Sequence, residues 1–182
     1  MKNKVKQLKS VFLQRLESLP FKGRFGGVHM KITEHFKLSE FERSETAKRL
    51  GIDNSVPKEF LPNIKALCEK VLEPLRAAIN KSPFKGDLEG LDILVKISSG
   101  YRCPALNKAV GGSASSQHMR GEAADIVIPD KKTGLKWFEW MRTHLTYNQL
   151  IWETNSRGGS WIHVGYKRTG KNKMQVLNMK VV

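Results

Sequence analysis

Apolar residues recur along one long stretch of the chain with the spacing of a helix face. After Pro57 they follow one another three or four positions apart, which is the period of an α-helix. The pattern predicts a long helix from Pro57 to Ala78, with a kink at Pro74 because proline lacks the N–H group that the helix needs. The residues of this stripe are Phe60, Ile64, Leu67, Val71, Leu75 and Ala78.

Local signals predict two further helices. Ser39 and Glu42 have the spacing of a capping box, which predicts a short helix that begins at Ser39 and that Gly51 can end. Residues 133–145 carry a second helical pattern along the chain. Its expected apolar face consists of Leu135, Phe138 and Met141.

Short apolar runs bounded by turn residues predict five β-strands. The expected strands are 93–97, 123–128, 149–152, 161–164 and 174–181. The third and the fourth are joined by a polar, glycine-containing loop, residues 154–160. Because strands and helices do not alternate strictly, the expected fold class is α+β, a small and mainly antiparallel sheet with flanking helices.

Length and composition restrict the class of protein. The chain has 182 residues, of which 40% are hydrophobic and 27% charged, as in a globular domain of ordinary size. No apolar run approaches the roughly 20 residues that cross a bilayer, so no transmembrane segment is expected. The lysine-rich N-terminus has neither the apolar stretch nor the cleavage site of a secretory signal peptide. Cys68 and Cys103 are expected to be free thiols.

The net charge of +15 is concentrated at the two ends of the chain. Residues 1–29 carry +6 and residues 165–182 carry +5, which leaves +4 for the body between them. We expect a basic leader or arm, 1–29, and one domain, 30–182, with a basic tail. Basic ends fit loose attraction to a polyanion such as an anionic cell-wall polymer, and they fit simple solubility as well. A nucleic-acid groove would spread its basic residues over the body, so no specific nucleic-acid binding is expected.

Two histidines and one aspartate are candidate metal ligands. His118 follows a turn-prone stretch, and Asp125 lies seven residues later within an apolar strand, where an unpaired carboxylate is costly. His163 lies on a predicted strand beside large apolar residues. Two histidines and one aspartate with an open fourth position make a catalytic zinc site. Spacing alone does not decide for a metal, because a buried aspartate bonded to backbone donors and a core histidine are the alternatives.

Three motifs follow one another in a specific order along the chain. They are Ser99-Gly100-Tyr101-Arg102 with Leu106-Asn107 and Val110-Gly111-Gly112, then Ser116-x-His118-x-x-Gly121-x-Ala123-x-Asp125-Ile126, and then Trp161-x-His163. Together they resemble the zinc D-Ala-D-Ala carboxypeptidase family, which includes phage peptidoglycan endopeptidases and shares its fold with the hedgehog signalling domain. The resemblance covers roughly residues 30–166. It includes the helical lead-in that is typical of members from phage and prophage genomes.

The resemblance implies one zinc ion per chain, bound by His118, Asp125 and His163. It also implies that Arg102 binds the substrate carboxylate or carbonyl near the metal, a role that suits the planar guanidinium fork. A surface ion pair is the alternative for this arginine.

Three further side chains are expected to contact the substrate. Ser116 matches the family serine beside the first zinc ligand and is the expected hydrogen-bond partner, with a turn cap as the alternative. Tyr101 and Trp161 stand within the motifs and complete the expected substrate-binding set.

The sequence departs from the family at the expected general base. Many members carry an acid three positions before the last histidine, where this chain has Ser160. If residues 154–160 form a hairpin loop, position 153 faces 161 and position 151 faces 163, so Glu153 and His163 share one sheet face. Glu153 is therefore the expected base, and an exposed glutamate at a strand end is the alternative.

The expected function is that of a zinc-dependent peptidase that cleaves peptidoglycan stem peptides, as a D-Ala-D-Ala carboxypeptidase or an endopeptidase of the endolysin type. We expect the enzyme to be a monomer, made in the cytoplasm of a phage-infected or prophage-bearing bacterium and acting at the cell wall. A non-catalytic binding module on the same fold is the first alternative, which Ser160 keeps open. A nucleic-acid-binding protein is the second, and it rests on net charge alone.

Overall fold

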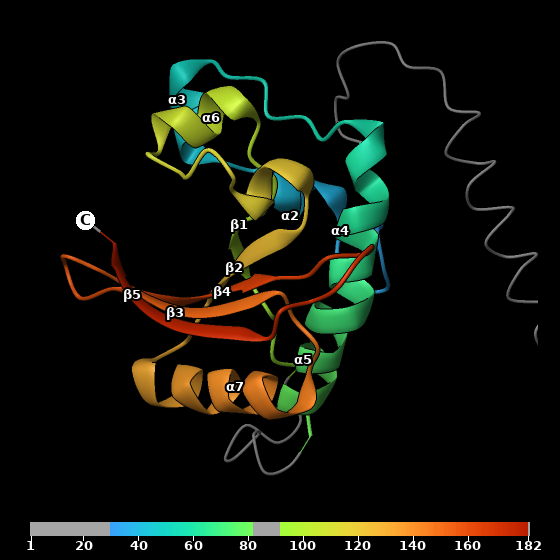
Figure 1. Ribbon diagram of the computed structural model, residues 1–182, viewed down its shortest axis with the longest axis vertical. Helices are drawn as coiled ribbons and strands as arrows, with labels where there is room; N and C mark the ends of the chain where they lie inside the picture. Colours follow the sequence, from blue (N-terminus) through green and yellow to red (C-terminus); the bar gives the residue numbers. More distant parts are fainter. Residues whose placement is uncertain (1–29, 82–91, 182) are drawn as a thin grey trace, which may run out of the picture.

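A five-stranded sheet forms the centre of the computed structural model, which describes residues 30–81 and 92–181 (Figure 1). The strands are β1 (Ile97–Ser99), β2 (Ala123–Val127), β3 (Gln149–Asn155), β4 (Ser160–Gly165) and β5 (Gln175–Val181). They lie in the order β1-β2-β4-β3-β5, with every neighbouring pair antiparallel except β3 and β5. The α+β class with a mainly antiparallel sheet is confirmed. The predicted leader, 1–29, lies outside the described residues.

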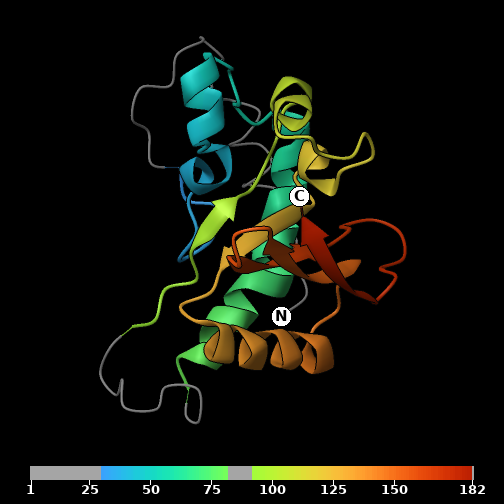
Figure 2. The same cartoon turned by 90° about the vertical axis from the view of Figure 1, so that its left-hand side faces the viewer.

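Helices flank this sheet on both faces. The helical segments are α2 (Leu38–Glu42), α3 (Glu45–Leu50), η1 (Lys58–Phe60), α4 (Leu61–Leu67), η2 (Cys68–Leu72), α5 (Glu73–Ile79), α6 (Pro104–Ala109), η3 (Gln117–Arg120) and α7 (Lys131–His144). Helices α4 and α5 continue as one rod beside the sheet, α7 covers one sheet face, and α3 and α6 lie beyond the other (Figures 1 and 2). Among the described helices, none has the length and apolar character to cross a membrane.

Side chains on the three inner strands alternate between two environments. Ala124, Ile126, Leu150, Ile162 and Val164 are fully buried and belong to the hydrophobic core. The residues between them point to the opposite face, because successive side chains of a strand alternate. One face of the sheet therefore packs on the core and α7, while the other carries the polar residues discussed below.

The hairpin of β3 and β4 has the predicted register. Ile151 pairs with His163, and Glu153 pairs with Trp161. The register follows from the alternation of apolar side chains, since a slip by one residue would move every core residue to the polar face. The last predicted strand is also present as β5, which pairs in parallel with β3 from Gln149 onward.

The long helix is present, but its turns are not uniform. It begins with the short 3-10 segment η1 after Pro57, and the widened π turn η2 follows α4. At this turn the N–H of Glu73 donates to the carbonyl of Cys68, five residues back. The next residue, Pro74, has no N–H to donate, so the predicted distortion takes the form of a π turn just before the proline.

The first predicted helix differs from the structure at its start and in its continuity. Helix α2 begins at Leu38 rather than Ser39, and the carboxylate of Glu40 accepts the backbone N–H of Lys37 at 2.7 Å. The chain then becomes extended, and the hydroxyl of Ser44 accepts the N–H of Ala47 to start α3. Gly51 ends α3 in the left-handed conformation, as predicted.

Two other predictions place residues wrongly. Helix α7 buries Gly134, Trp137 and Met141, whereas the predicted Leu135 is 49% exposed. The strand predicted at 93–97 begins only at Ile97, although Val95 is buried. Apolar character alone determines neither the face by which a helix packs nor the backbone hydrogen bonds that a segment makes.

Gly100 stands where two segments approach closely. A Cβ atom at this position would lie 2.5 Å from the Cα of Phe41, a backbone atom that no side-chain rotation can move away. We predict that Gly100→Ala lowers the free energy of unfolding by about 1–3 kcal/mol, the usual cost of overpacking. Chemical denaturation measures this change, and an unaltered midpoint would contradict the packing described here.

Candidate active site

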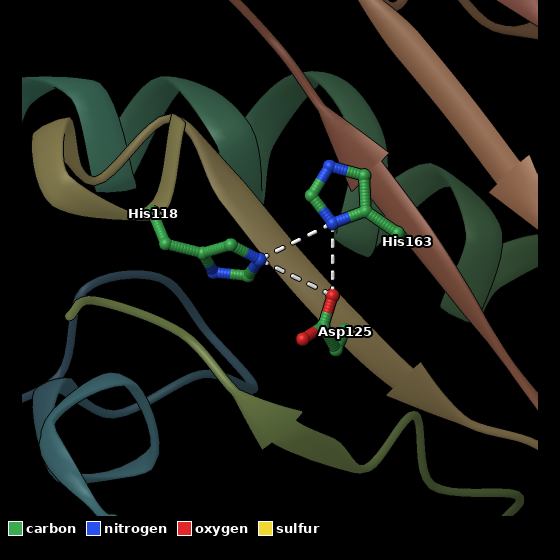
Figure 3. Close-up of side chains that lie close together, drawn as sticks. All are labelled: His118, Asp125 and His163. Atoms are coloured by element: carbon green, nitrogen blue, oxygen red, sulfur yellow. Dashed lines mark hydrogen bonds and ion pairs between the residues drawn. The ribbon is translucent and has the colours of Figure 1, made fainter. Parts of the chain in front are cut away.

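Three buried side chains meet on the polar face of the sheet (Figure 3). His118 comes from η3, Asp125 from the centre of β2, and His163 from β4, where it is the direct cross-strand partner of Asp125. The Oδ1 atom of Asp125 lies 2.9 Å from Nδ1 of His163 and 3.2 Å from Nε2 of His118. The two histidine nitrogens are 3.2 Å apart. The structure thus brings the three predicted metal ligands together.

The spacing of the donor atoms is close to the one that a zinc ion requires. Zinc bound at about 2.0–2.2 Å by nitrogen and oxygen in a tetrahedral arrangement separates its ligand atoms by about 3.3–3.5 Å. The three separations here are slightly shorter, at 2.9, 3.2 and 3.2 Å. Two imidazole nitrogens and one carboxylate oxygen are also a donor set that zinc prefers. The residues present therefore fit zinc.

A backbone carbonyl orients the first histidine. Nδ1 of His118 lies 2.6 Å from the carbonyl oxygen of Gly100, so Nδ1 carries the proton and donates it. This leaves the lone pair of Nε2 directed at Asp125 and His163, as a ligand must have it. Burial lowers the pKa of His118 and outweighs the raising effect of Asp125. The ring is therefore neutral at physiological pH, the form that binds a metal.

Asp125 is held ionised in the interior by its neighbours. Burial by itself would raise the pKa of this carboxyl group, but His118 and His163 lower it far below its usual range. The second carboxylate oxygen accepts a 2.6 Å bond from Nη2 of Arg102, whose Nε donates to the hydroxyl of Ser99 at 2.8 Å. Arg102 thus forms a largely buried ion pair with a candidate ligand, and the alternative of a surface ion pair is wrong.

The three ligands lie in a cleft of about 720 Å³ that runs across the polar face of the sheet. Its walls include Arg102, Ser116, Glu153 and Trp161, four of the residues predicted to act on the substrate. The hydroxyl of Ser116 makes no capping bond to η3, so the predicted alternative of a turn cap is wrong.

Tyr101 is the one predicted site residue that does not line this cleft. Its side chain is 4% exposed, and its ring packs against that of Phe60 with the centroids 5.9 Å apart. The residue shares the motif of Arg102 but points to the other side of the segment, into the interior.

Glu153 lies beside the ligand cluster, on the neighbouring strand. Its cross-strand partner is Trp161, two residues before His163, so Glu153 and His163 occupy diagonal positions on one face. Burial raises the pKa of Glu153, the charge of Asp125 adds to this effect, and His163 opposes it. Glu153 therefore is not an exposed strand-end glutamate but a half-buried acid at the edge of the cluster.

Ser160 has a different role in the hairpin. Its hydroxyl lies 3.0 Å from that of Thr154, its cross-strand partner at the end of the hairpin. The residue closes the β-ladder where family members commonly carry an acid, and Glu153 is the acid that this hairpin presents to the cleft.

Three contributors to the site did not emerge from the sequence. The Gly100 carbonyl orients His118 and the Ser99 hydroxyl orients Arg102, and both groups belong to the first motif, whose spacing does not predict these contacts. Gln117 also lines the cleft, and its buried side-chain amide lies against Gly165. A Cβ atom added at Gly165 would lie 2.2 Å from the oxygen of this amide. Gly165 is the last residue of β4, and a glycine within a strand is the sequence signal for such a close approach.

Comparison with known protein families agrees with this geometry. The family model described as peptidase M15 matches residues 34–165, the segment that contains all three ligands and Glu153. The chain belongs to the M15 peptidase family. This is the family of the zinc D-Ala-D-Ala carboxypeptidases that the motifs resemble, so the protein is a metallopeptidase of a type that acts on peptidoglycan. Comparison with curated protein sequences gives no match.

The M15 protein is predicted to bind one zinc ion per chain through the cluster. His118→Ala and His163→Ala should each lose most of the metal, because either change leaves an incomplete set of ligands. His144→Ala, which removes an exposed histidine outside the cluster, should retain it. Elemental analysis of the purified variants measures the zinc content. One zinc per chain in both cluster variants would contradict the assignment.

Proposed function

We propose that this M15 protein is a zinc-dependent peptidase that cleaves peptidoglycan stem peptides at a D-Ala-D-Ala or related bond. The observation that carries the proposal is the cluster of His118, Asp125 and His163 with Glu153 beside it in one cleft. A metal-ligand set, an adjacent carboxylate and an arginine within one cleft are the parts that metal-assisted hydrolysis requires.

The cluster residues would hold the zinc ion, which when bound acts as a Lewis acid that polarises a carbonyl and lowers the pKa of water. Glu153 accepts a proton from the attacking water at its carboxylate oxygen and is the general base of the proposal. Its half-buried position gives this carboxylate a raised pKa, which makes it a stronger proton acceptor once ionised. Asp125 cannot take this role, because its Oδ1 belongs to the ligand cluster and its Oδ2 accepts a bond from Arg102.

Arg102 positions the substrate in the proposal. The Nε and Nη2 groups of its guanidinium are bonded to Ser99 and Asp125, and Nη1 has no partner among residues 30–81 and 92–181. This fixed fork presents a donor to the cleft, suited to a carboxylate or carbonyl oxygen of the peptide. Ser116 and Trp161 supply a hydroxyl and an aromatic surface from other walls of the cleft. Tyr101 is left out of the substrate-binding set, because its side chain is buried away from the cleft.

The proposal extends to where the protein acts. Lys171 and Lys173 in the basic tail are exposed, so they are available for attraction to an anionic cell-wall polymer. We place the protein as a monomer at the bacterial cell wall after synthesis in the cytoplasm of a phage-infected or prophage-bearing host.

The central experiment is mass spectrometry of purified muropeptides after incubation with the zinc-loaded protein. A defined mass loss identifies the bond that is cleaved, and the loss should require zinc. Intact muropeptides that nevertheless bind to the protein would favour the non-catalytic binding module instead.

The role of Glu153 has a direct test. Glu153→Gln keeps the size and hydrogen-bonding capacity of the side chain but removes the base, so the rate should fall by about 10²- to 10⁴-fold. Zinc content and thermal stability should stay close to those of the parent. Glu45→Gln is the matched control, because Glu45 is another acid that lines the cleft. Turnover of Glu153→Gln within a few-fold of the parent would place the base elsewhere.

A further inference from the structure

The strand β5 lies beyond the segment that defines the family, yet it lines the cleft. The family match ends at residue 165, and β5 occupies residues 175–181. Leu177 and Met179 of this strand line the same cleft as the ligand cluster. The cleft therefore has a part that the family motifs do not describe.

The strand register fixes where these two side chains stand. Ser99, Asp125, His163, Ile151 and Leu177 are successive partners across the sheet, from β1 through β2, β4 and β3 to β5. Directly opposed residues point to the same face, so one row of side chains leads from the cluster to Leu177.

The next row has the same direction. Trp161, Glu153 and Met179 are successive partners on β4, β3 and β5, two positions along each strand from the first row. Met179 therefore stands beside Glu153 on the face that carries the cluster.

The floor of the cleft changes in character along this direction. Near β1 and β2 it is polar and charged, with the Arg102 guanidinium and Asp125. Over β3 it carries Ile151 between Gln149 and Glu153, and over β5 it carries, among the described residues, only Leu177 and Met179, of which Met179 is 46% exposed. An apolar surface that continues from a catalytic cluster within one cleft is suited to uncharged aliphatic groups of a bound peptide.

We infer that β5 forms an apolar subsite for an uncharged aliphatic side chain of the peptide substrate, on the amino side of the cleaved bond. The inference rests on the proposed function, and it takes Arg102 to bind a carboxylate or carbonyl oxygen on the carboxyl side of that bond. Since Arg102 and β5 lie on opposite sides of the cluster, a peptide that crosses the strands extends its amino side over β5.

Sheet dimensions give the position of the subsite along the peptide. Two strand spacings separate β4, which carries His163, from β5, a distance of about 10 Å. An extended peptide rises about 3.3 Å per residue, so the third residue or so on the amino side reaches Leu177 and Met179. Peptides with a single residue on that side do not reach them.

The test uses a peptide series that shares the cleaved bond and carries one to four residues on its amino side. For the zinc-loaded parent, kcat/KM should rise by about tenfold when an alanine at the third position is added, as expected for partial burial of an aliphatic contact. Met179→Ser should lose this rise and keep the kcat/KM of the shortest peptide. Val176→Ser is the matched control, since Val176 is 41% exposed on the same strand but points to the opposite face.

A second readout does not depend on turnover. In methyl-labelled protein, the Met179 resonance should shift on addition of the longest peptide and not of the shortest one. Met174, which is 44% exposed but does not line the cleft, should stay unchanged with both. A shift at Met179 without cleavage of any peptide would support the subsite while contradicting the proposed function.

Three results would overturn the subsite. The first is a kcat/KM independent of peptide length while the shortest peptide is cleaved. The second is equal behaviour of Met179→Ser and Val176→Ser. The third is a Met179 shift that depends on protein concentration without peptide, which would mean that a second copy of the chain covers β5.

Discussion

A buried carboxylate in the middle of a strand is the constraint on which the site depends. Asp125 lies among apolar residues in β2, and its ionised oxygens lie against His118, His163 and Arg102. Charge in the interior is tolerated only where such partners are fixed. Each partner comes from a different segment, so the η3 turn, the β2–β4 register and the end of β1 must all be correct at once. A metal ion bound here would add the positive charge that this arrangement favours.

Part of this site could be predicted from the sequence. A hairpin loop between β3 and β4 sets position 153 opposite 161 and position 151 opposite 163, so the presence of Glu153 and His163 on one face could be predicted from parity. The ligand set followed from motif order rather than from physics, since His118 and Asp125 are joined by a turn whose shape their spacing does not determine.

What the sequence could not predict depended on contacts between distant segments. The side of the chain to which Tyr101 points is set by its packing on Phe60, and apolar residues of α7 such as Leu135 satisfy the helical period equally well when exposed. The parallel pairing of β5 with β3 requires a long connection, and no local signal distinguishes it from an antiparallel pair. Because of this pairing, the basic tail contributes to the sheet and to the cleft.

The buried cluster is proposed to bind zinc through Nε2 of His118, Nδ1 of His163 and Oδ1 of Asp125. The most direct measurement is X-ray diffraction from zinc-loaded crystals at energies on both sides of the zinc absorption edge. One anomalous peak per chain is expected, about 2.0–2.2 Å from each of these three atoms. A peak at any other group of residues, or none at the cluster in crystals that contain one zinc per chain, would contradict it.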